Sequence, residues 1–243
     1  MGNINKKWAI IVLSILTVFV VQPYAHAKQI KVAVIDTGFD FASKWHNSKL
    51  SKPKLCKSGH KDFTGTSVMD NHSHGTHISS LIASGNDKIN YCIVELKYFD
   101  KNPKVDTLST VIKAISHAIA LKVAIINLSI SGLYHSKLEC ALLTRALDKG
   151  IKVIAAAGNN SLNIDRYKSY PAMCDKRIMV VMNGKNNKDL NATSNYSFGK
   201  NTYILDGKEV KGLGINDSEI VLSGTSQSAA LLTSKVLREL KNY

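Results

Sequence analysis

The stretch Gln29–Gly38, QIKVAVIDTG, indicates the fold class most directly. Its first part, Gln29–Ile35, is rich in valine and isoleucine, which is typical of a buried strand. Asp36-Thr37-Gly38 follows at once and favours a turn. The fold therefore begins with a buried strand that presents a carboxylate, Asp36, at its carboxyl end.

Downstream of this strand, the sequence alternates between further strands and helices. Short apolar runs predict strands over residues 91–99, 123–130, 151–156 and 178–182. Asp206-Gly207 lies between two short extended runs, which indicates a hairpin.

Three helices are predicted from their apolar period or their caps. Apolar residues recur at helical spacing over residues 108–121, with Asp106 or Thr107 as the N-cap. Ser136-Lys137-Leu138-Glu139 is a capping box that opens a second helix, and a third apolar helix face follows residue 226. The alternation predicts a single α/β domain of three layers, with a mostly parallel central sheet between helices.

Residues 1–27 have the pattern of a secretory signal peptide. Two lysines are followed by an apolar stretch over residues 8–21, and Ala25-His26-Ala27 provides the small residues that a signal peptidase reads. An uncleaved anchor or a buried core helix is the alternative, but the stretch is short for a membrane span. We expect residues 28–243 to form the folded domain.

The composition narrows the class of protein. The 243 residues include 32 Lys and Arg against 18 Asp and Glu, a formal net charge of +14, and 44% are apolar. That apolar fraction excludes wholesale disorder, and the counts of 15 Gly, 4 Pro and 4 Cys exclude collagen-like and disulfide-dense classes. The lysines are scattered and do not interleave with aromatic residues, so a solvated cationic surface is favoured over a nucleic-acid groove.

The four cysteines, Cys56, Cys92, Cys140 and Cys174, are widely spaced and form no C-x-x-C motif. This spacing disfavours a zinc or thioredoxin-like site. In an oxidising compartment two disulfides are expected, with four buried free thiols as the alternative. The spacing leaves all three possible pairings open.

Four polar residues follow predicted strands or open predicted helices. Asp36 ends the first strand, Asn159 follows the strand at 151–156, and His74 and Ser226 lie where helices begin. In a parallel sheet, active groups collect at the carboxyl ends of the strands, so we expect these side chains to converge. A hydroxyl, an imidazole, a carboxylate and oxyanion donors are the set that nucleophilic catalysis needs.

The motifs around these residues resemble those of the subtilisin-like serine proteases, the subtilase family. The resemblance rests on Val-Ile-Asp-Thr-Gly at Asp36, His-Ser-His-Gly-Thr-His at His74, Ala-Ala-Ala-Gly-Asn at Asn159 and Ser-Gly-Thr-Ser-Gln-Ser-Ala at Ser226. All four motifs occur in this order between about residues 30 and 240, which is far more specific than any one of them.

The resemblance implies a serine endopeptidase with a subtilisin-like α/β fold and an acyl-enzyme intermediate, and the signal-peptide pattern implies a secreted or periplasmic location. In that family pattern Ser226 is the nucleophile, His74 the base, Asp36 its orienting partner, and Asn159 a donor of the oxyanion hole. The segment that binds the substrate backbone and walls the P1 pocket corresponds to Ser129, Ile130, Ser131 and Gly132.

The same resemblance sets the expected partners. No cofactor takes part in this chemistry, and the partner is a polypeptide substrate rather than a nucleic acid. A monomer is expected, without stable membrane insertion once the signal is removed. The alternative is a non-catalytic binding protein on a subtilase scaffold.

Some residues depart from the family pattern. Ser131 replaces a glycine that is usual beside the P1 pocket, which is expected to narrow that pocket. Lys49 stands where an aspartate ligand of the family's calcium loop often does, so the strongest calcium site is expected to be absent. His72, His74 and His77 offer a metal cluster as an alternative reading, but no carboxylate completes it, and we expect no metal.

The resemblance also bears on the disulfides and on folding. In the family, the strand after Cys56 neighbours the strand that holds Cys92, which implies the pairs Cys56–Cys92 and Cys140–Cys174. No propeptide is visible between the predicted signal and the first strand, so we expect a compact member that folds without one, provided that its disulfides form.

Overall fold

The computed structural model describes residues 29–102 and 104–240, so the predicted signal peptide over residues 1–27 lies outside the described residues. The strands are β1 (Ile30–Asp36), β2 (Lys61–Asp62), β3 (Tyr91–Lys97), β4 (Ile125–Leu128), β5 (Lys152–Ala156), β6 (Met179–Asn186), β7 (Asp189–Leu190), β8 (Thr202–Leu205), β9 (Val210–Leu213) and β10 (Glu219–Leu222). The helices are α1 (His74–Ala83), α2 (Thr107–Ala120), α3 (Lys137–Asp148) and α4 (Thr225–Leu240).

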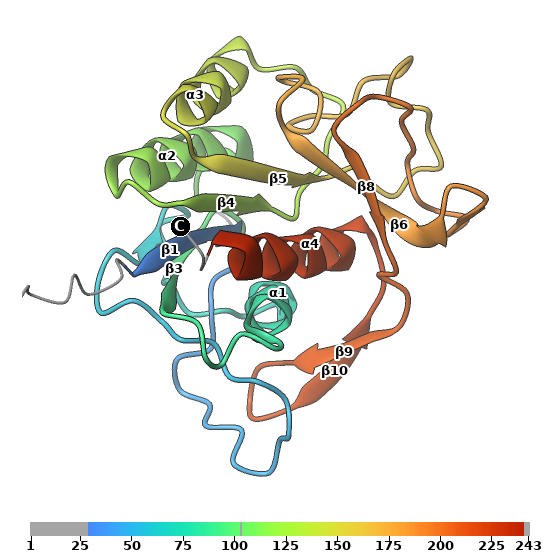
Figure 1. Cartoon of the computed structure of the whole chain (residues 1–243). Helices are drawn as coiled ribbons and strands as arrows, with labels where there is room; N and C mark the ends of the chain where they lie inside the picture. The colour runs from blue at the N-terminus through green and yellow to red at the C-terminus, as the bar shows by residue number, and fades with distance from the viewer. Residues whose placement is uncertain (1–28, 103, 241–243) are drawn as a thin grey trace, which may run out of the picture.

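One sheet of eight strands runs through the middle of the molecule (Figure 1). The strand order is β2-β3-β1-β4-β5-β6-β7, with β8 also paired to β6. Each pairing in this sheet is parallel apart from that of β6 with β7. The adjacent strands β1, β4 and β5 therefore bring their carboxyl ends to the same edge of the sheet.

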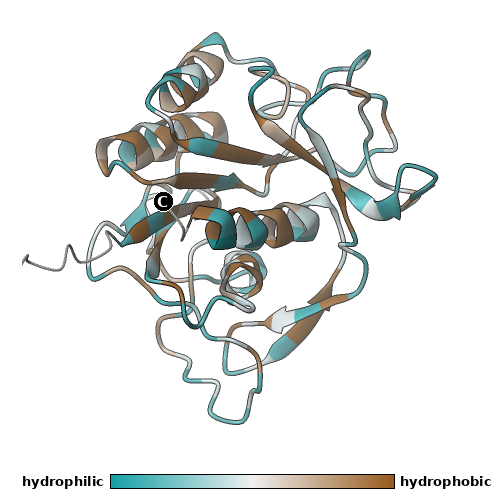
Figure 2. Ribbon diagram, in the orientation of Figure 1, coloured by the Kyte–Doolittle hydropathy of each residue, from teal (hydrophilic) through white to brown (hydrophobic). Residues whose placement is uncertain are grey.

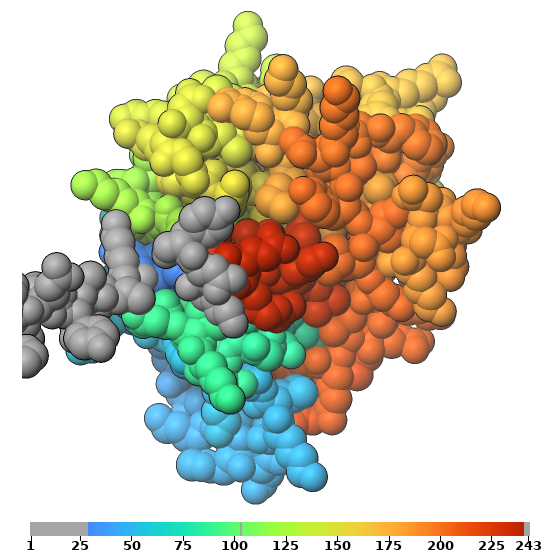
Figure 3. All heavy atoms as spheres, viewed as in Figure 1, coloured from blue at the N-terminus to red at the C-terminus, as the bar shows by residue number. Residues whose placement is uncertain are grey.

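Helices cover both faces of this sheet, as the sequence predicts. α2 and α3 pack over one face, and α1 and α4 pack over the other (Figure 1). In β1, Ala33 and Ile35 belong to the first core and Val32 and Val34 to the second, so the run of apolar residues is buried on both sides. Apolar residues concentrate on the central strands, and the outer side of α4 stays at the surface (Figures 2 and 3). The three-layer α/β fold with a mostly parallel sheet is confirmed.

The two predicted helix caps form to different extents. Asp106 caps α2, where its carboxylate accepts a hydrogen bond from the backbone N–H of Ser109 at 2.7 Å. At α3, the Ser136 hydroxyl oxygen accepts a hydrogen bond from the backbone N–H of Glu139 at 3.2 Å. The hydrogen bonds of the described residues include none from the backbone N–H of Ser136 to the Glu139 carboxylate, so only half of the predicted capping box is formed.

The hairpin predicted at Asp206-Gly207 is wrong. The flanking strands do not pair with each other, because β8 joins β6 in parallel and β9 pairs with β10. Gly207 instead lies against the start of α4, where a Cβ on this residue would be 2.4 Å from Ser228 Oγ and 2.5 Å from the Gly224 carbonyl oxygen. A glycine is needed here for close approach of the backbone, a requirement that looks like a turn signal in the sequence.

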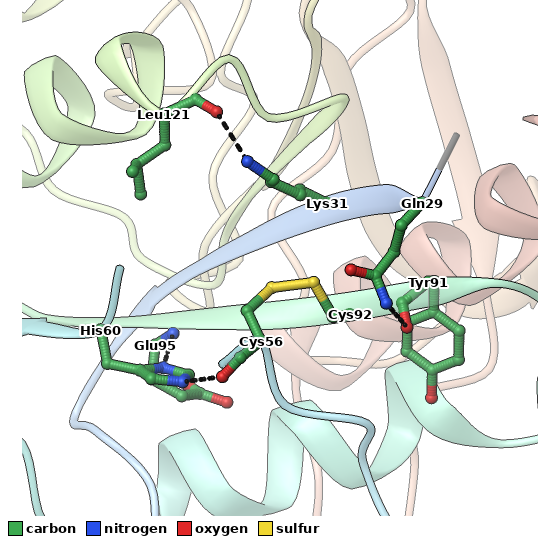
Figure 4. The surroundings of a disulfide bond; sticks show 8 residues. All are labelled: Gln29, Lys31, Cys56, His60, Tyr91, Cys92, Glu95 and Leu121. Carbon is green, nitrogen blue, oxygen red and sulfur yellow. Dashed lines mark hydrogen bonds between the residues drawn. A yellow bond between two sulfur atoms is a disulfide. The ribbon is translucent and has the colours of Figure 1, made fainter. Parts of the chain in front are cut away.

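Two disulfides join segments that lie more than 30 residues apart in the sequence. The structure joins Cys56 to Cys92 and Cys140 to Cys174, the pairs that the family resemblance implies, each with a Cα–Cα distance of 4.8 Å. His60 lies beside the first disulfide (Figure 4), where its Nε2 donates a hydrogen bond to the Cys56 carbonyl oxygen at 2.8 Å. Within residues 29–102 and 104–240, no helix has the length and apolar content needed to cross a bilayer.

Candidate active site

The carboxylate and the imidazole expected in the site form its first arm. Asp36 ends β1, and His74 is the first residue of α1. His74 Nδ1 donates a hydrogen bond to Asp36 Oδ1 at 2.7 Å, and the two side chains are 23% and 1% exposed. Burial acts to lower the pKa of His74, but the charge and hydrogen bond of Asp36 and the charge of Asp70 outweigh it and raise that pKa. His74 Nε2 remains as the ring nitrogen that can accept a proton.

A second buried carboxylate, Asp70, holds this arm in place. Its oxygens accept hydrogen bonds at 2.7–3.0 Å from the backbone N–H groups of His72, Ser73 and Thr76 and from the hydroxyls of Thr37 and Thr76. The Thr37 hydroxyl oxygen accepts a further bond from the N–H of Gly75 at 2.8 Å. A Cβ on Gly75 would lie 2.2 Å from the Gly38 carbonyl oxygen, so the start of α1 packs directly on the turn after β1.

Asp70 is absent from the site residues expected from the sequence. The signal that marks it is an acidic residue just before a helix start, where a short carboxylate binds the free N–H groups of the first turn. Here that carboxylate also ties the first turn of α1 to Thr37, the residue that follows Asp36.

The serine hydroxyl belongs to a second arm, shared with the segment after β4. Ser226 is the second residue of α4, where unpaired N–H groups favour negative charge. Ser226 Oγ donates a hydrogen bond to the Ser129 carbonyl oxygen at 3.0 Å, and Ser129 Oγ donates one to the Ser226 carbonyl oxygen at 3.1 Å. No hydrogen bond joins Ser226 to His74 in the part of the chain that the structure describes. The expected chain of contacts is thus present from Asp36 to His74 and is not closed onto Ser226.

Asn159 lies just beyond β5, against the start of α4. Its Oδ1 accepts hydrogen bonds from the backbone N–H of Thr225 at 3.0 Å and from the Thr225 hydroxyl at 3.1 Å. Because a backbone N–H can only donate, the atom that faces it is the amide oxygen. The amide NH₂ group has no hydrogen-bond partner among the described residues, so a donor is available beside the helix start for a developing oxyanion.

The residues expected to bind substrate, Ser129, Ile130, Ser131 and Gly132, follow β4 directly. Gly132 exchanges two backbone hydrogen bonds with Tyr170, each 2.8 Å long. The backbone N–H and C=O of Ser131 have no hydrogen-bond partner in the described chain, and an open edge of this kind can pair with an extended peptide. A Cβ on Gly158 would lie 3.0 Å from Ser131 Oγ, so the Ser131 side chain narrows the gap between this segment and the end of β5.

The neighbouring histidines contact other parts of the fold. His77 Nε2 donates a hydrogen bond to the Val210 carbonyl oxygen at 3.0 Å, and burial lowers the pKa of His77 to about 4, so this ring is neutral at physiological pH. His72 packs edge-on against Phe99, with ring centroids 6.0 Å apart. Across residues 29–102 and 104–240, no group of three or more His, Cys, Asp or Glu side chains is arranged to hold a metal ion.

Comparison with known proteins gives a family match over most of the chain. A family model described as "Subtilase family" matches residues 27–240. Among curated proteins, the minor extracellular protease Epr of Bacillus subtilis (strain 168) is 27% identical over 209 residues, which cover 83% of this chain and 30% of Epr. Subtilisin J of Geobacillus stearothermophilus is 31% identical over 171 residues, which cover 65% of this chain and 42% of subtilisin J. The chain thus spans less than half the length of both relatives.

Solved structures show the same fold. The epidermin leader peptide processing serine protease EpiP from Staphylococcus aureus superimposes with a TM-score of 0.72 at 19% identity, covering 90% of this chain and 68% of EpiP. A cold adapted subtilisin-like serine proteinase superimposes with a TM-score of 0.69 at 19% identity, covering 88% of this chain and 76% of the proteinase. The subtilisin-like architecture expected from the motifs is confirmed.

Proposed function

The chain belongs to the subtilase family, and on that premise we propose that it is a secreted or periplasmic serine endopeptidase that hydrolyses peptide bonds through an acyl-enzyme. The observation that carries the proposal is the buried hydrogen bond of 2.7 Å from His74 to Asp36, because it orients an imidazole that is otherwise free to accept a proton. Membership of the family supports peptidase chemistry, and the name of the relative Epr and the two disulfides support an extracellular or periplasmic location.

In the proposed mechanism, Ser226 is the nucleophile. Its hydroxyl rotates from the Ser129 carbonyl oxygen to His74 Nε2, gives up its proton there, and attacks the scissile carbonyl carbon. Asp36 stabilises the imidazolium that forms, and His74 then gives the proton to the leaving amine. Water hydrolyses the resulting ester by the same steps in reverse, and no cofactor is needed.

Two donors stabilise the negative charge that develops on the substrate oxygen. One is the amide NH₂ of Asn159, which the bonds from Thr225 to its oxygen orient. The other is the backbone N–H of Ser226 at the start of α4. The partner in this proposal is an extended polypeptide that pairs with the open backbone groups of Ser131, while the enzyme itself acts as a monomer.

One observation favours a second candidate, a non-catalytic binding protein on the same scaffold. Ser226 Oγ donates its hydrogen bond to Ser129 rather than to His74. If that hydroxyl were held there permanently, the protein would bind peptides without cleaving them.

Hydrolysis of an unfolded polypeptide separates the two functions. The purified protein is expected to cleave reduced, carboxymethylated casein, and Ser226→Ala is expected to lower kcat on the order of 10⁶-fold, into the background. Ser51→Ala, in the loop between β1 and β2, is the matched control and should keep full activity. Equal cleavage by the wild-type and Ser226→Ala proteins, or none by either, would contradict the proposed function.

A further inference from the structure

A pocket of about 610 Å³ opens beside the segment expected to bind substrate. Its walls come from the start of α2, the segment Ile130–Tyr134, the start of α3 and the Tyr170–Pro171 turn. α2 and α3 lie side by side on this face of the sheet (Figure 1). Because Ser131 borders both this pocket and the gap beside Gly158, a peptide paired with Ser131 lies within reach of both.

Glu139 is the buried charged group of this pocket. The residue is 4% exposed, and its carboxylate has no hydrogen bond or ion pair with any described residue. Among the described residues, the Glu139 carboxylate accepts no hydrogen bond from Ser136, and it lies in the first turn of α3, where the helix dipole favours a negative charge. Burial raises the pKa of Glu139 to about 7. A carboxylate left without a partner in a pocket favours binding of a cation.

The rest of the lining fits a long basic side chain. The pocket walls contain no Lys, Arg or His, although the chain has 32 Lys and Arg against 18 Asp and Glu. A second carboxylate, Asp106, stands at the start of α2. Leu108, Val111 and Ile130 supply apolar walls, against which the methylene stem of Lys or Arg packs well.

The rim of the pocket also looks like a surface that a ligand covers. Leu133 and Tyr134 line it and are 69% and 73% exposed, among the most exposed large apolar side chains of the described residues. An extended peptide places alternate side chains on opposite sides, so one that lies along Ser131 directs a side chain toward Glu139 at a fixed position.

We propose that this pocket binds a lysine or arginine side chain of the polypeptide substrate, with Glu139 as the specificity-determining carboxylate. The inference rests on the proposed peptidase function. It concerns a substrate residue other than the one that enters the gap between Ser131 and Gly158. Substrate choice is then set by charge in a pocket that touches neither Ser226 nor His74.

The test uses matched fluorogenic peptides in which lysine or norleucine is moved through the four positions before the scissile bond. Norleucine keeps the stem of lysine and lacks its charge. At pH 8.5, where Glu139 is ionised, kcat/KM should favour lysine about 10- to 100-fold at one position, the ratio that a hydrogen bond to a charged group supplies. Glu139→Gln should bring the ratio of kcat/KM for the lysine peptide over the norleucine peptide close to one, while Glu239→Gln, an exposed change on α4, should keep the wild-type ratio.

Glu139→Gln is expected to fold, because it removes a charge that burial disfavours, and its melting temperature at pH 8.5 should not fall. A lack of lysine preference at every position, or a preference that survives Glu139→Gln, would overturn the proposal while leaving the peptidase function intact. If the protein cleaves nothing, the proposed peptidase function is contradicted, but the proposed pocket can still be tested by binding. The same peptides, labelled for fluorescence anisotropy, must then bind more tightly with lysine than with norleucine, and Glu139→Gln must remove that difference in affinity.

Discussion

The two arms of the candidate active site differ in how firmly the fold holds them. The Asp36–His74 arm is fixed by buried groups: Asp36 is 1% exposed, and Asp70 accepts five hydrogen bonds, two from Thr76 in the first turn of α1, two from the residues just before α1 and one from Thr37. The Ser226 arm is held more lightly. The hydroxyls of Ser226 and Ser129 each donate one hydrogen bond to the carbonyl oxygen of the other residue. In the proposed mechanism, the acid–base half is therefore assembled in advance, whereas the Ser226 hydroxyl has to leave the Ser129 carbonyl oxygen before it can reach His74.

The difference has a physical reason. Ionised carboxylates and imidazole need several hydrogen bonds when they are buried, and these bonds fix the backbone around them. A serine hydroxyl is small, costs little to reorient, and needs only one acceptor, here the Ser129 carbonyl oxygen. Substitutions in the first arm should therefore change both chemistry and stability, and those in the second arm should change chemistry alone.

The largest effect is expected for Asp36→Asn. This change keeps the shape of the side chain but favours the wrong tautomer of His74, so kcat should fall by about 10⁴-fold. Because Asp36 raises the pKa of His74, the rise of kcat/KM with pH should also move to lower pH in the variant. A pH–rate profile measured on wild type and variant checks both, and an unmoved profile would show that Asp36 does not act on His74.

Asn159→Ala removes the proposed oxyanion donor and leaves the buried Asp36–His74 pair in place. Loss of one oxyanion donor should lower kcat by about 10²- to 10³-fold with little change in KM. Asn160→Ala, at the exposed neighbouring residue, is the matched control and should behave as wild type. The melting temperature of Asn159→Ala should stay within a few degrees of wild type, and an equal loss in both variants would remove Asn159 from the mechanism.

Asp70→Asn tests whether Asp70 holds the start of α1, and with it His74, in position beside Asp36. An amide cannot accept all the bonds that the carboxylate accepts, so the free energy of unfolding should fall by about 1–3 kcal/mol. As the start of α1 loosens, kcat should fall by about 10- to 30-fold, since small displacements of a catalytic group are costly. Asp148→Asn, in an exposed ion pair with Arg177, is the control and should cost under about 1 kcal/mol. Full activity with normal stability in Asp70→Asn would show that Asp70 is no positioning residue.

The smallest effect is expected for Ser131→Gly, which opens the gap beside Gly158. Peptides with a large side chain before the scissile bond should gain about 3- to 10-fold in kcat/KM relative to those with alanine there. The hydrolysis of the alanine peptides should change little, because the backbone groups of residue 131 remain. An unchanged ratio between the two peptide series would show that Ser131 does not limit the side chain accepted.

The sequence predicts much of this molecule because its strongest signals are local. The buried run before Asp36, the cap at Asp106 and the four motifs at strand ends or helix starts each depend on a few adjacent residues. The features that were not predicted depend on partners far along the chain. β8 pairs with β6 rather than β9, Glu139 faces a pocket built by three other segments, and Asp70 gains its role only when α1 packs on the turn after β1.

The position of the Ser226 hydroxyl lies beyond any sequence pattern, since its acceptor is the carbonyl oxygen of Ser129, far along the chain. The most direct measurement is covalent labelling with a fluorophosphonate, followed by mass spectrometry of the peptides. A single adduct on Ser226 is expected, absent in Ser226→Ala and formed at least about 10²-fold more slowly in His74→Ala, because the imidazole activates the hydroxyl. A folded protein that forms no adduct on Ser226, or forms it equally fast without His74, would contradict a nucleophile activated by the Asp36–His74 arm.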